Sequence, residues 1–394
     1  MTESLRATTR REVEAAAAGL VELSHTIHAH PELAFEEERS SRWVAEALSD
    51  AGLDVETGVC DLPTAFVATA GRGPLTVGIC AEYDALPGIG HACGHNVIAA
   101  AAVGAGAALA RVADDLGIAV RVLGTPAEEG GGGKILMLER GAFDGVHAAM
   151  MVHPAPMEQV HMECLAVSHF DVFFHGKAAH ASAFPERGIN AADALTVAQV
   201  AVGLLRQHFS AGNQVHGIVT KGGEAPNIVP AETSAKYYVR ARTLRELEAL
   251  EPRVMRCFDA GRIATGATYD VRHASPPYSE FRPEQELLAA YRHCAGQLGR
   301  TFVDFDKTPG FELKGGSTDM ANVSLALPAI HPLLGIDSLP AVNHQPEFAA
   351  AAVSPAADRA VVDGALAMAW TAIEVAAEGP LRHRLLGAKP QSSR

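Results

Sequence analysis

The sequence predicts an α/β protein of two domains, and three observations carry this prediction. The chain has 394 residues, which is more than one hydrophobic core usually serves. Short β-like runs alternate with helical segments in the first and last parts of the chain, as they do in layered α/β folds. Between these parts, residues 165–280 follow a βαββαβ order, which is typical of a ferredoxin-like unit. We therefore expect a discontinuous domain of residues 1–164 and 281–394, interrupted by an inserted domain of residues 165–280.

The discontinuous domain is predicted to begin with two amphipathic helices. Thr9 with Glu12 matches a capping box, and apolar positions at helical spacing follow to about Ile27. A turn at Pro31 leads to the second helix, which ends at Gly52. The expected strands of this domain lie at 64–70, 75–81, 119–125 and 147–153, with a helix from about 96 to 113 and an alanine-rich helix after 355.

The inserted domain has a different order of predicted strands and helices. Its expected elements are a strand at 166–176, a helix at 189–209, strands at 214–223 and 232–242, a helix at 244–264 and a strand at 268–274. Proline-rich stretches at 154–156 and 275–283 flank them. We interpret these stretches as the crossings into and out of the insertion.

The composition narrows the possible partners. Lys and Arg total 32 against 46 Asp and Glu, so the formal net charge is −14, which argues against nucleic acid as a partner. The six cysteines show no CxxC pair or disulfide framework spacing, which favours a reducing cytosol. We find no signal-peptide pattern and no run near the roughly 20 apolar residues of a membrane span. We therefore expect a soluble, cytoplasmic protein without a membrane partner.

Several segments carry side chains that bind metals in proteins. Thiolate, imidazole and carboxylate form mixed ligand sets for ions such as Zn²⁺. The candidates are Cys93 with His95, the acidic pair Glu128 and Glu129, His153, and His344. Taken singly, each has an ordinary interpretation as a buried thiol, a solvated acid pair or a hydrogen-bonded histidine. All four segments belong to the α/β domain, and Glu128, Glu129 and His153 directly follow apolar runs. Because sites collect at the carboxyl ends of strands in such sheets, these positions can converge there.

Three other functional motifs are incomplete or absent. The stretch "EEGGGGK" resembles a phosphate-binding loop, but Glu128 stands at its first glycine and Ile135 at its Ser/Thr position. In "GIGHACG", Cys93 takes the place of the third glycine of a dinucleotide-binding motif. The chain also has no GxSxG elbow. Nucleotide binding and serine hydrolysis are therefore disfavoured.

The motifs resemble those of a known family. They include "HAHPELAFEE", "AEYDALPGIGHACGHN", "GTPAEEGGGGK", "MMVHPAP", "GKAAHAS", "GGEAPNIVP", "GGSTDMANVS" and "AVNHQPEF". In this order the chain resembles the co-catalytic metallo-amidohydrolases and peptidases of the aminoacylase and carboxypeptidase-G type. The more similar branch holds hippurate hydrolase, the indole-acetyl-amino-acid hydrolases and the p-aminobenzoyl-glutamate hydrolase subunits. The resemblance implies a zinc-peptidase-like domain with a mixed central sheet flanked by helices, and an inserted lid and dimerisation domain.

The resemblance also implies roles for individual residues. Two divalent ions, Zn²⁺ or Mn²⁺, would share one centre. The implied ligands are Cys93 as the bridge, His95 and Glu129 on one ion, and His153 and His344 on the other. Glu128 matches the general base that deprotonates the bridging water, and Asp84 matches the acid that orients a ligand. In the inserted domain, His180 matches a histidine that contacts the oxyanion, and Asn227 matches a residue near the substrate carboxylate.

The chain departs from the family pattern at two places. Glu82 stands where other branches have a ligand histidine, and Asn96 replaces an aspartate that commonly follows "HACGH". These departures concern the substrate more than the metal core. We expect hydrolysis of an amide bond in an N-acyl amino acid, a dipeptide or an aryl-glutamate, by a homodimer formed through the lid. The alternatives are a hydrolase of non-peptidic amides and an inactive, metal-binding regulatory subunit.

Overall fold

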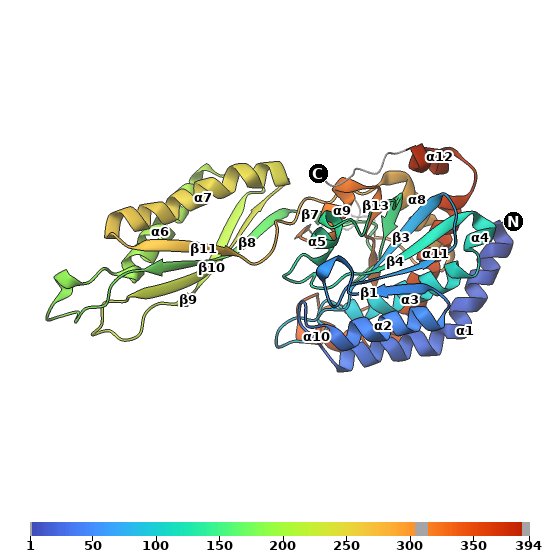
Figure 1. The fold of residues 1–394 in the computed structure, drawn as a ribbon, viewed down its shortest axis with the longest axis horizontal. Helices are drawn as coiled ribbons and strands as arrows, with labels where there is room; N and C mark the ends of the chain where they lie inside the picture. Colours follow the sequence, from blue (N-terminus) through green and yellow to red (C-terminus); the bar gives the residue numbers. More distant parts are fainter. Residues whose placement is uncertain (1, 304–313, 388–394) are drawn as a thin grey trace. The chain divides into compact units, whose positions relative to one another are not determined.

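The computed structural model describes residues 2–303 and 314–387, and the chain divides into two compact units (Figure 1). The first unit comprises Met1–Glu163 and Phe281–Arg394, and the second comprises Cys164–Glu280. Each unit has a sheet and a hydrophobic core of its own. An α/β fold with a discontinuous first unit is therefore present.

A six-stranded mixed sheet forms the centre of the first unit. Its strand order is β1 (Asp54–Thr57), β2 (Phe66–Ala70), β4 (Ile118–Gly124), β3 (Leu75–Ala81), β5 (Ala148–Met150) and β13 (Ala329–Ile330). Strands β4, β3, β5 and β13 run parallel to one another, whereas β2 pairs antiparallel with both β1 and β4. The predicted mixed central sheet is confirmed. Its parallel part brings the carboxyl ends of β3, β4 and β5 to one edge.

Helices and short strands complete this unit. The helices are α1 (Thr2–Ala29), α2 (Glu38–Asp50), η1 (Val59–Asp61), α3 (His95–Ala110), α4 (Ala113–Leu116), α5 (Gly133–Glu139), α8 (Gln285–Gln297), α9 (Met320–Ala326), α10 (Pro346–Ala351), α11 (Pro355–Ala376) and α12 (Pro380–Gly387). The short strands are β6 (His153–Ala155), which pairs in parallel with β14 (Leu333–Gly335), and β7 (Glu163–Cys164) and β12 (Lys314–Gly316).

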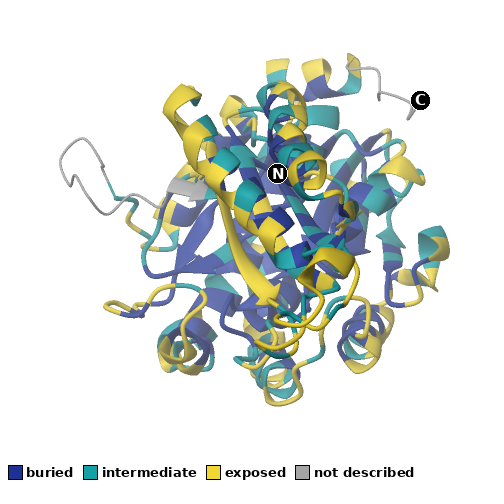
Figure 2. Cartoon of the chain, turned by 90° about the vertical axis from the view of Figure 1, so that its left-hand side faces the viewer, coloured by how far each residue is buried: buried dark blue, intermediate teal, exposed yellow. Residues whose placement is uncertain are grey.

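Helices cover both faces of the central sheet. Because successive side chains of a strand point to opposite faces, one strand contributes to the apolar clusters on both sides. On β3, Val77 and Ile79 belong to the apolar cluster that includes side chains of α1, α3 and α11. Cys80 belongs to a second cluster, to which α5 and α9 contribute. Figure 2 shows buried strands in the interior and several helices that are buried on one side and exposed on the other. This two-layer cover explains why the predicted β-like runs are apolar at almost every position.

The predicted start of the first helix is wrong. Helix α1 begins at Thr2, so the Thr9–Glu12 pair lies inside the helix. Thr9 is buried, and its hydroxyl donates to the Arg6 carbonyl oxygen one turn earlier at 3.0 Å. This is the alternative use of a threonine hydroxyl within a helix. The Thr9–Glu12 pattern, which resembles a capping box, therefore lies in a buried turn of the helix.

The second unit has the predicted βαββαβ order. Its elements are β8 (Ala166–His175), η2 (Pro185–Arg187), α6 (Ala191–Leu205), η3 (Arg206–His208), β9 (Gln214–Lys221), β10 (Glu232–Ala241), α7 (Leu244–Thr265) and β11 (Thr268–His273). The four strands form an antiparallel sheet in the order β11-β8-β10-β9. Side chains of α6 and α7 pack against it in one apolar cluster. A ferredoxin-like unit accounts for this topology.

Among the described residues, no single helix is long and apolar enough to cross a membrane. Helices α11 and α12 together have the length and apolar composition of a membrane span, but they are bent by 85° at the break between them. Most side chains of α11 are buried within the first unit.

Candidate metal centre

The parallel strands deliver acidic and imidazole side chains to one edge of the sheet. Strand β3 ends at Ala81 and is followed by Glu82 and Asp84, and β4 ends at Gly124 shortly before Glu128 and Glu129. Met151 and Val152 separate β5 from His153, which begins the short strand β6. This placement follows from the parallel pairing of β3 with β4 and β5.

A glycine turn brings Cys93 and His95 into the same place. Gly94 has a φ of +80°, and a Cβ atom built on it would lie 2.6 Å from Pro154 Cγ. Only glycine fits both this left-handed conformation and this close approach. The turn ends at once in α3, whose first residue is His95. Both Cys93 and His95 are buried.

Asp84 orients this histidine. Its Oδ1 lies 2.9 Å from His95 Nδ1, and its Oδ2 accepts the backbone N–H of Glu129 at 2.9 Å. Because a carboxylate only accepts, His95 Nδ1 carries a proton and Nε2 is left to bind a ligand. One carboxylate therefore connects the histidine to the acidic loop.

The candidate ligand atoms form two groups that share Cys93. Cys93, His95 and His153 form the first, and Cys93, Glu129 and His344 form the second, each with ligand atoms within 4.8 Å of one another. Cys93 Sγ lies 3.5 Å from His153 Nε2, and Glu129 Oε1 lies 3.6 Å from His344 Nε2. The resemblance paired His95 with Glu129 instead. Those two side chains are also close, with 3.9 Å between Nε2 and Oε1.

The neutral imidazole of His153 and two unpaired atoms fit a divalent cation. Burial lowers the pKa of His153 to about 4, so His153 is a neutral imidazole. Among the described residues, His95 Nε2 and Glu129 Oε1 are buried without a hydrogen-bond partner. A buried polar atom without a partner is unfavourable unless something else binds it. Sulfur, nitrogen and oxygen atoms that lie close together form a mixed ligand set that binds divalent metal ions.

Glu128 is buried and belongs to a third group of potential ligands. Its Oε2 lies 3.9 Å from His95 Nε2, and Glu82, His95 and Glu128 also have ligand atoms within 4.8 Å of one another. Burial raises the pKa of Glu128 well above its usual value, and the charges of Glu82 and Glu129 raise it further. A carboxylate with a raised pKa holds a proton more readily, which suits a general base.

Sequence reasoning did not anticipate the charged cluster behind this group. Lys134 Nζ lies 2.5 Å from Glu82 Oε1 and 2.7 Å from Asp319 Oδ1, and all three side chains are fully buried. Asp319 Oδ2 also accepts the Lys134 backbone N–H at 2.8 Å. Lys134 is the lysine of the stretch that resembled a phosphate-binding loop. The positive charge of Lys134 forms ion pairs with two carboxylates of the protein itself.

His180 and Asn227 both lie in the second unit, where their segments pair. The Ala181 N–H donates to the Asn227 carbonyl oxygen at 3.0 Å, and both site residues are exposed. His180 Nδ1 accepts the Ala183 backbone N–H at 3.1 Å. The proton of a neutral His180 therefore sits on Nε2, which is free to donate.

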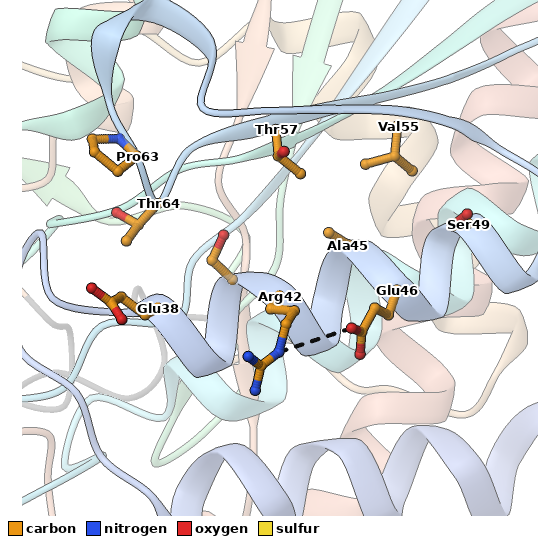
Figure 3. A pocket seen from close by; sticks show the side chains of 10 residues that line it. Glu38, Arg42, Ala45, Glu46, Ser49, Val55, Thr57, Pro63 and Thr64 are labelled. Carbon is orange, nitrogen blue, oxygen red and sulfur yellow. Dashed lines mark ion pairs between the residues drawn. The ribbon is translucent and has the colours of Figure 1, made fainter.

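A separate hollow of about 530 Å³ lies between α2 and the β1–β2 region (Figure 3). Its lining includes Arg42 and Glu46, which form an exposed ion pair at 3.8 Å, and Thr64. None of the predicted site residues lines it.

The comparisons with known proteins assign the chain to a family. The model of peptidase family M20/M25/M40 matches residues 78–361. The chain belongs to this family. The M20 match spans more than half of the sequence and covers every predicted metal ligand, which confirms the resemblance inferred from the motifs.

Relatives within this family are also similar over most of the chain. Xaa-Arg dipeptidase of Mus musculus is 39% identical over 392 residues, which cover 95% of this chain and 89% of the relative. A p-aminobenzoyl-glutamate hydrolase protein of Escherichia coli (strain K12) is 33% identical over 73% of this chain and 64% of its own. The M20 chain is thus a hydrolase that acts on amide or peptide bonds.

A solved structure shares the fold. The YXEP protein of Bacillus subtilis, described as a dinuclear metal binding peptidase from the M20 family, aligns with a TM-score of 0.66 at 22% identity. The alignment covers 92% of this chain and 99% of that one. At this identity the likeness concerns the fold alone.

Proposed function

We propose that this M20 hydrolase cleaves an amide bond in an N-acyl amino acid, a dipeptide or an aryl-glutamate at a two-metal centre. The observation that carries the proposal is the Cys93 thiol shared by two ligand groups, with Glu128 beside them. Dipeptidase and aryl-glutamate hydrolase relatives support the substrate class. Cys93, His95, Glu129, His153 and His344 would hold two divalent ions, Zn²⁺ or Mn²⁺.

Two such ions, when bound, lower the pKa of a shared water and polarise the scissile carbonyl. Glu128 accepts the proton from the attacking water and returns it to the leaving amine. Asp84 keeps His95 in the tautomer that presents Nε2, through the 2.9 Å contact with Nδ1. The buried position of Glu128 keeps bulk water away from the proton that it carries.

The second unit supplies the remaining proposed roles. His180 donates from Nε2 to the oxyanion, and Asn227 binds the substrate carboxylate. We also propose that this unit acts as a lid and joins two copies of the chain in a homodimer. Strand β9 lies at an edge of its sheet, with Ile218 65% exposed and Val219 46% exposed. An exposed edge strand of this kind can pair with another chain, and light scattering would reveal the dimer.

Asp84→Asn is expected to lower metal affinity about 10–100-fold, as loss of a partner that orients a ligand does. The amide would retain one acceptor for two donors, the His95 Nδ1–H and the Glu129 N–H. Competition with a chromophoric chelator measures the affinity. Asp54→Asn, an exposed change on β1, serves as the control. If Asp84→Asn and Asp54→Asn bind the metal with equal affinity, Asp84 does not support the metal centre.

The proposed function is tested by metal stoichiometry together with a substrate panel. Elemental analysis is expected to give about two equivalents of metal, as a two-metal site requires. A panel of N-acyl amino acids, dipeptides, p-aminobenzoyl-glutamate and simple aryl amides is expected to show chelator-sensitive cleavage of one of the first three classes. Cleavage of only the aryl amides would support the non-peptidic alternative. Full metal without cleavage of any amide would favour a binding role, and failure to bind Zn²⁺ or Mn²⁺ would overturn the assignment of Cys93.

A further inference from the structure

A buried carboxylate outside the metal centre contacts the loop that carries Glu128 and Glu129. Glu37 immediately precedes α2 and is fully buried. Its Oε1 accepts the backbone N–H of Ala127 at 2.8 Å and that of Phe35 at 3.0 Å. Its Oε2 accepts the Thr64 hydroxyl at 3.0 Å. The carboxylate is thus satisfied by three donors, one of which belongs to the residue before Glu128.

Ala127 has a backbone conformation that requires support. Its φ is +59°, in the left-handed region, which L residues other than glycine, asparagine and aspartate rarely adopt. Its carbonyl oxygen accepts the N–H groups of Gly131 and Gly132, both at 2.9 Å. Its own N–H is directed at Glu37. The conformation of Ala127 decides the direction in which the chain continues into Glu128 and Glu129, and such strained residues persist where their surroundings hold them.

The segment around Glu37 contacts both acidic loops of the centre. The Glu32 carbonyl oxygen accepts the N–H of Ala85, next to Asp84, at 2.8 Å. The ring of Phe35 lies so near Gly131 that a Cβ atom on that glycine would be 2.4 Å from Phe35 Cε2. Residues 32–37 therefore hold the Asp84 loop by one backbone hydrogen bond and the Glu128 loop by the Glu37 carboxylate.

We propose that Glu37 is a positioning residue for hydrolysis, which acts through the Ala127 amide to set the orientation of Glu128 and Glu129. The inference rests on the proposed function, since it takes Glu128 as the base. Glu37 lies outside the ligand groups and acts only through the backbone.

The hydrogen-bond pattern permits a sharp comparison of two variants. Both backbone donors use Oε1, and only the Thr64 hydroxyl uses Oε2. In Glu37→Gln, the side-chain carbonyl can take the place of Oε1, and the NH₂ group can donate to Thr64, because a hydroxyl also accepts. Glu37→Ala removes all three contacts. Burial, with the Asp84 charge adding to it, raises the pKa of Glu37 to about 7, so a neutral side chain is compatible with this place.

The expected result is a loss of kcat in Glu37→Ala of up to about 100-fold, the effect of misplacing a catalytic group by about 1 Å. KM should change little, and metal content should stay at the level of the unmodified protein. Glu37→Gln should restore kcat. With metals removed, amides of residues 127–132 should exchange hydrogen faster in Glu37→Ala and at the original rate in Glu37→Gln. A merely structural role would lower stability without this division between kcat and KM.

Further variants keep the test decisive. If Glu37→Ala does not fold, Glu37→Asp retains the carboxyl group but withdraws it by one methylene, and it should lose kcat where Glu37→Gln does not. An unchanged kcat in Glu37→Ala or Glu37→Asp, or an equal loss in Glu37→Gln, would overturn the inference. Glu128→Gln is assayed beside them. Full turnover by Glu128→Gln would instead contradict the proposed function, so the two failures are distinguishable.

Discussion

Glu128→Gln is expected to reduce kcat by about 10²–10⁴-fold, the range that general acid–base catalysis contributes. Glutamine has the same shape as glutamate but cannot take a proton from the attacking water. Its side chain would still fill the buried place beside His95 Nε2, from which Glu128 Oε2 lies 3.9 Å away. Single-turnover assays with metal-saturated protein measure the effect on the chemical step.

The neighbouring acid provides a matched contrast. Glu129 belongs to a ligand group with Cys93 and His344, so Glu129→Gln is expected to lower metal affinity. Glu128→Gln should keep the metal content of the unmodified protein while turnover falls. The two adjacent acids would then separate into a proton carrier and a ligand. Loss of metal from Glu128→Gln to the same extent as from Glu129→Gln would contradict the assignment of the base.

The convergence of the candidate ligands could be predicted because local sequence patterns carry them. Cys93 and His95 stand in a glycine-bounded loop, and Glu128, Glu129 and His153 follow apolar runs that are now seen as β4 and β5. Parallel pairing of the strands brings these separate stretches to one edge. The expected convergence thus needed only the strand positions and the general behaviour of α/β sheets, whereas the role of each residue came from the family resemblance.

The supporting contacts could not be predicted in the same way, because they join residues that are distant in the chain. Asp319 is 185 positions from Lys134, and Ala127 is 90 positions from Glu37. Lys134 also occurs in a stretch with another interpretation, a phosphate-binding loop. The Thr9 error has a related cause, since a short motif does not reveal which face of a helix is buried. Only the tertiary structure shows which partner each charge meets.

Lys134→Met is expected to destabilise the protein by about 3–5 kcal/mol, the typical effect of removing one partner from a buried ion pair. Burial alone would lower the pKa of Lys134, but the Asp319 and Glu82 carboxylates hold that pKa well above its usual value. The ammonium is therefore charged in the folded protein. Methionine has a similar length and apolar stem, so the change removes the charge with little loss of packing. Urea unfolding in the presence of a chelator measures the free energy without a contribution from bound metal.

Two further variants show whether the unpaired carboxylates cause the loss. Lys221→Met removes an exposed lysine that pairs with Glu224 and Glu232, and it should hardly move the urea midpoint. Adding Asp319→Asn to Lys134→Met removes one of the stranded charges, and it should recover part of the lost stability although it introduces a second change. A Lys134→Met midpoint equal to that of Lys221→Met would mean that the buried carboxylates do not need this ammonium. A double variant less stable than Lys134→Met alone would assign Asp319 a role beyond pairing with Lys134, through the Lys134 backbone N–H that it also accepts.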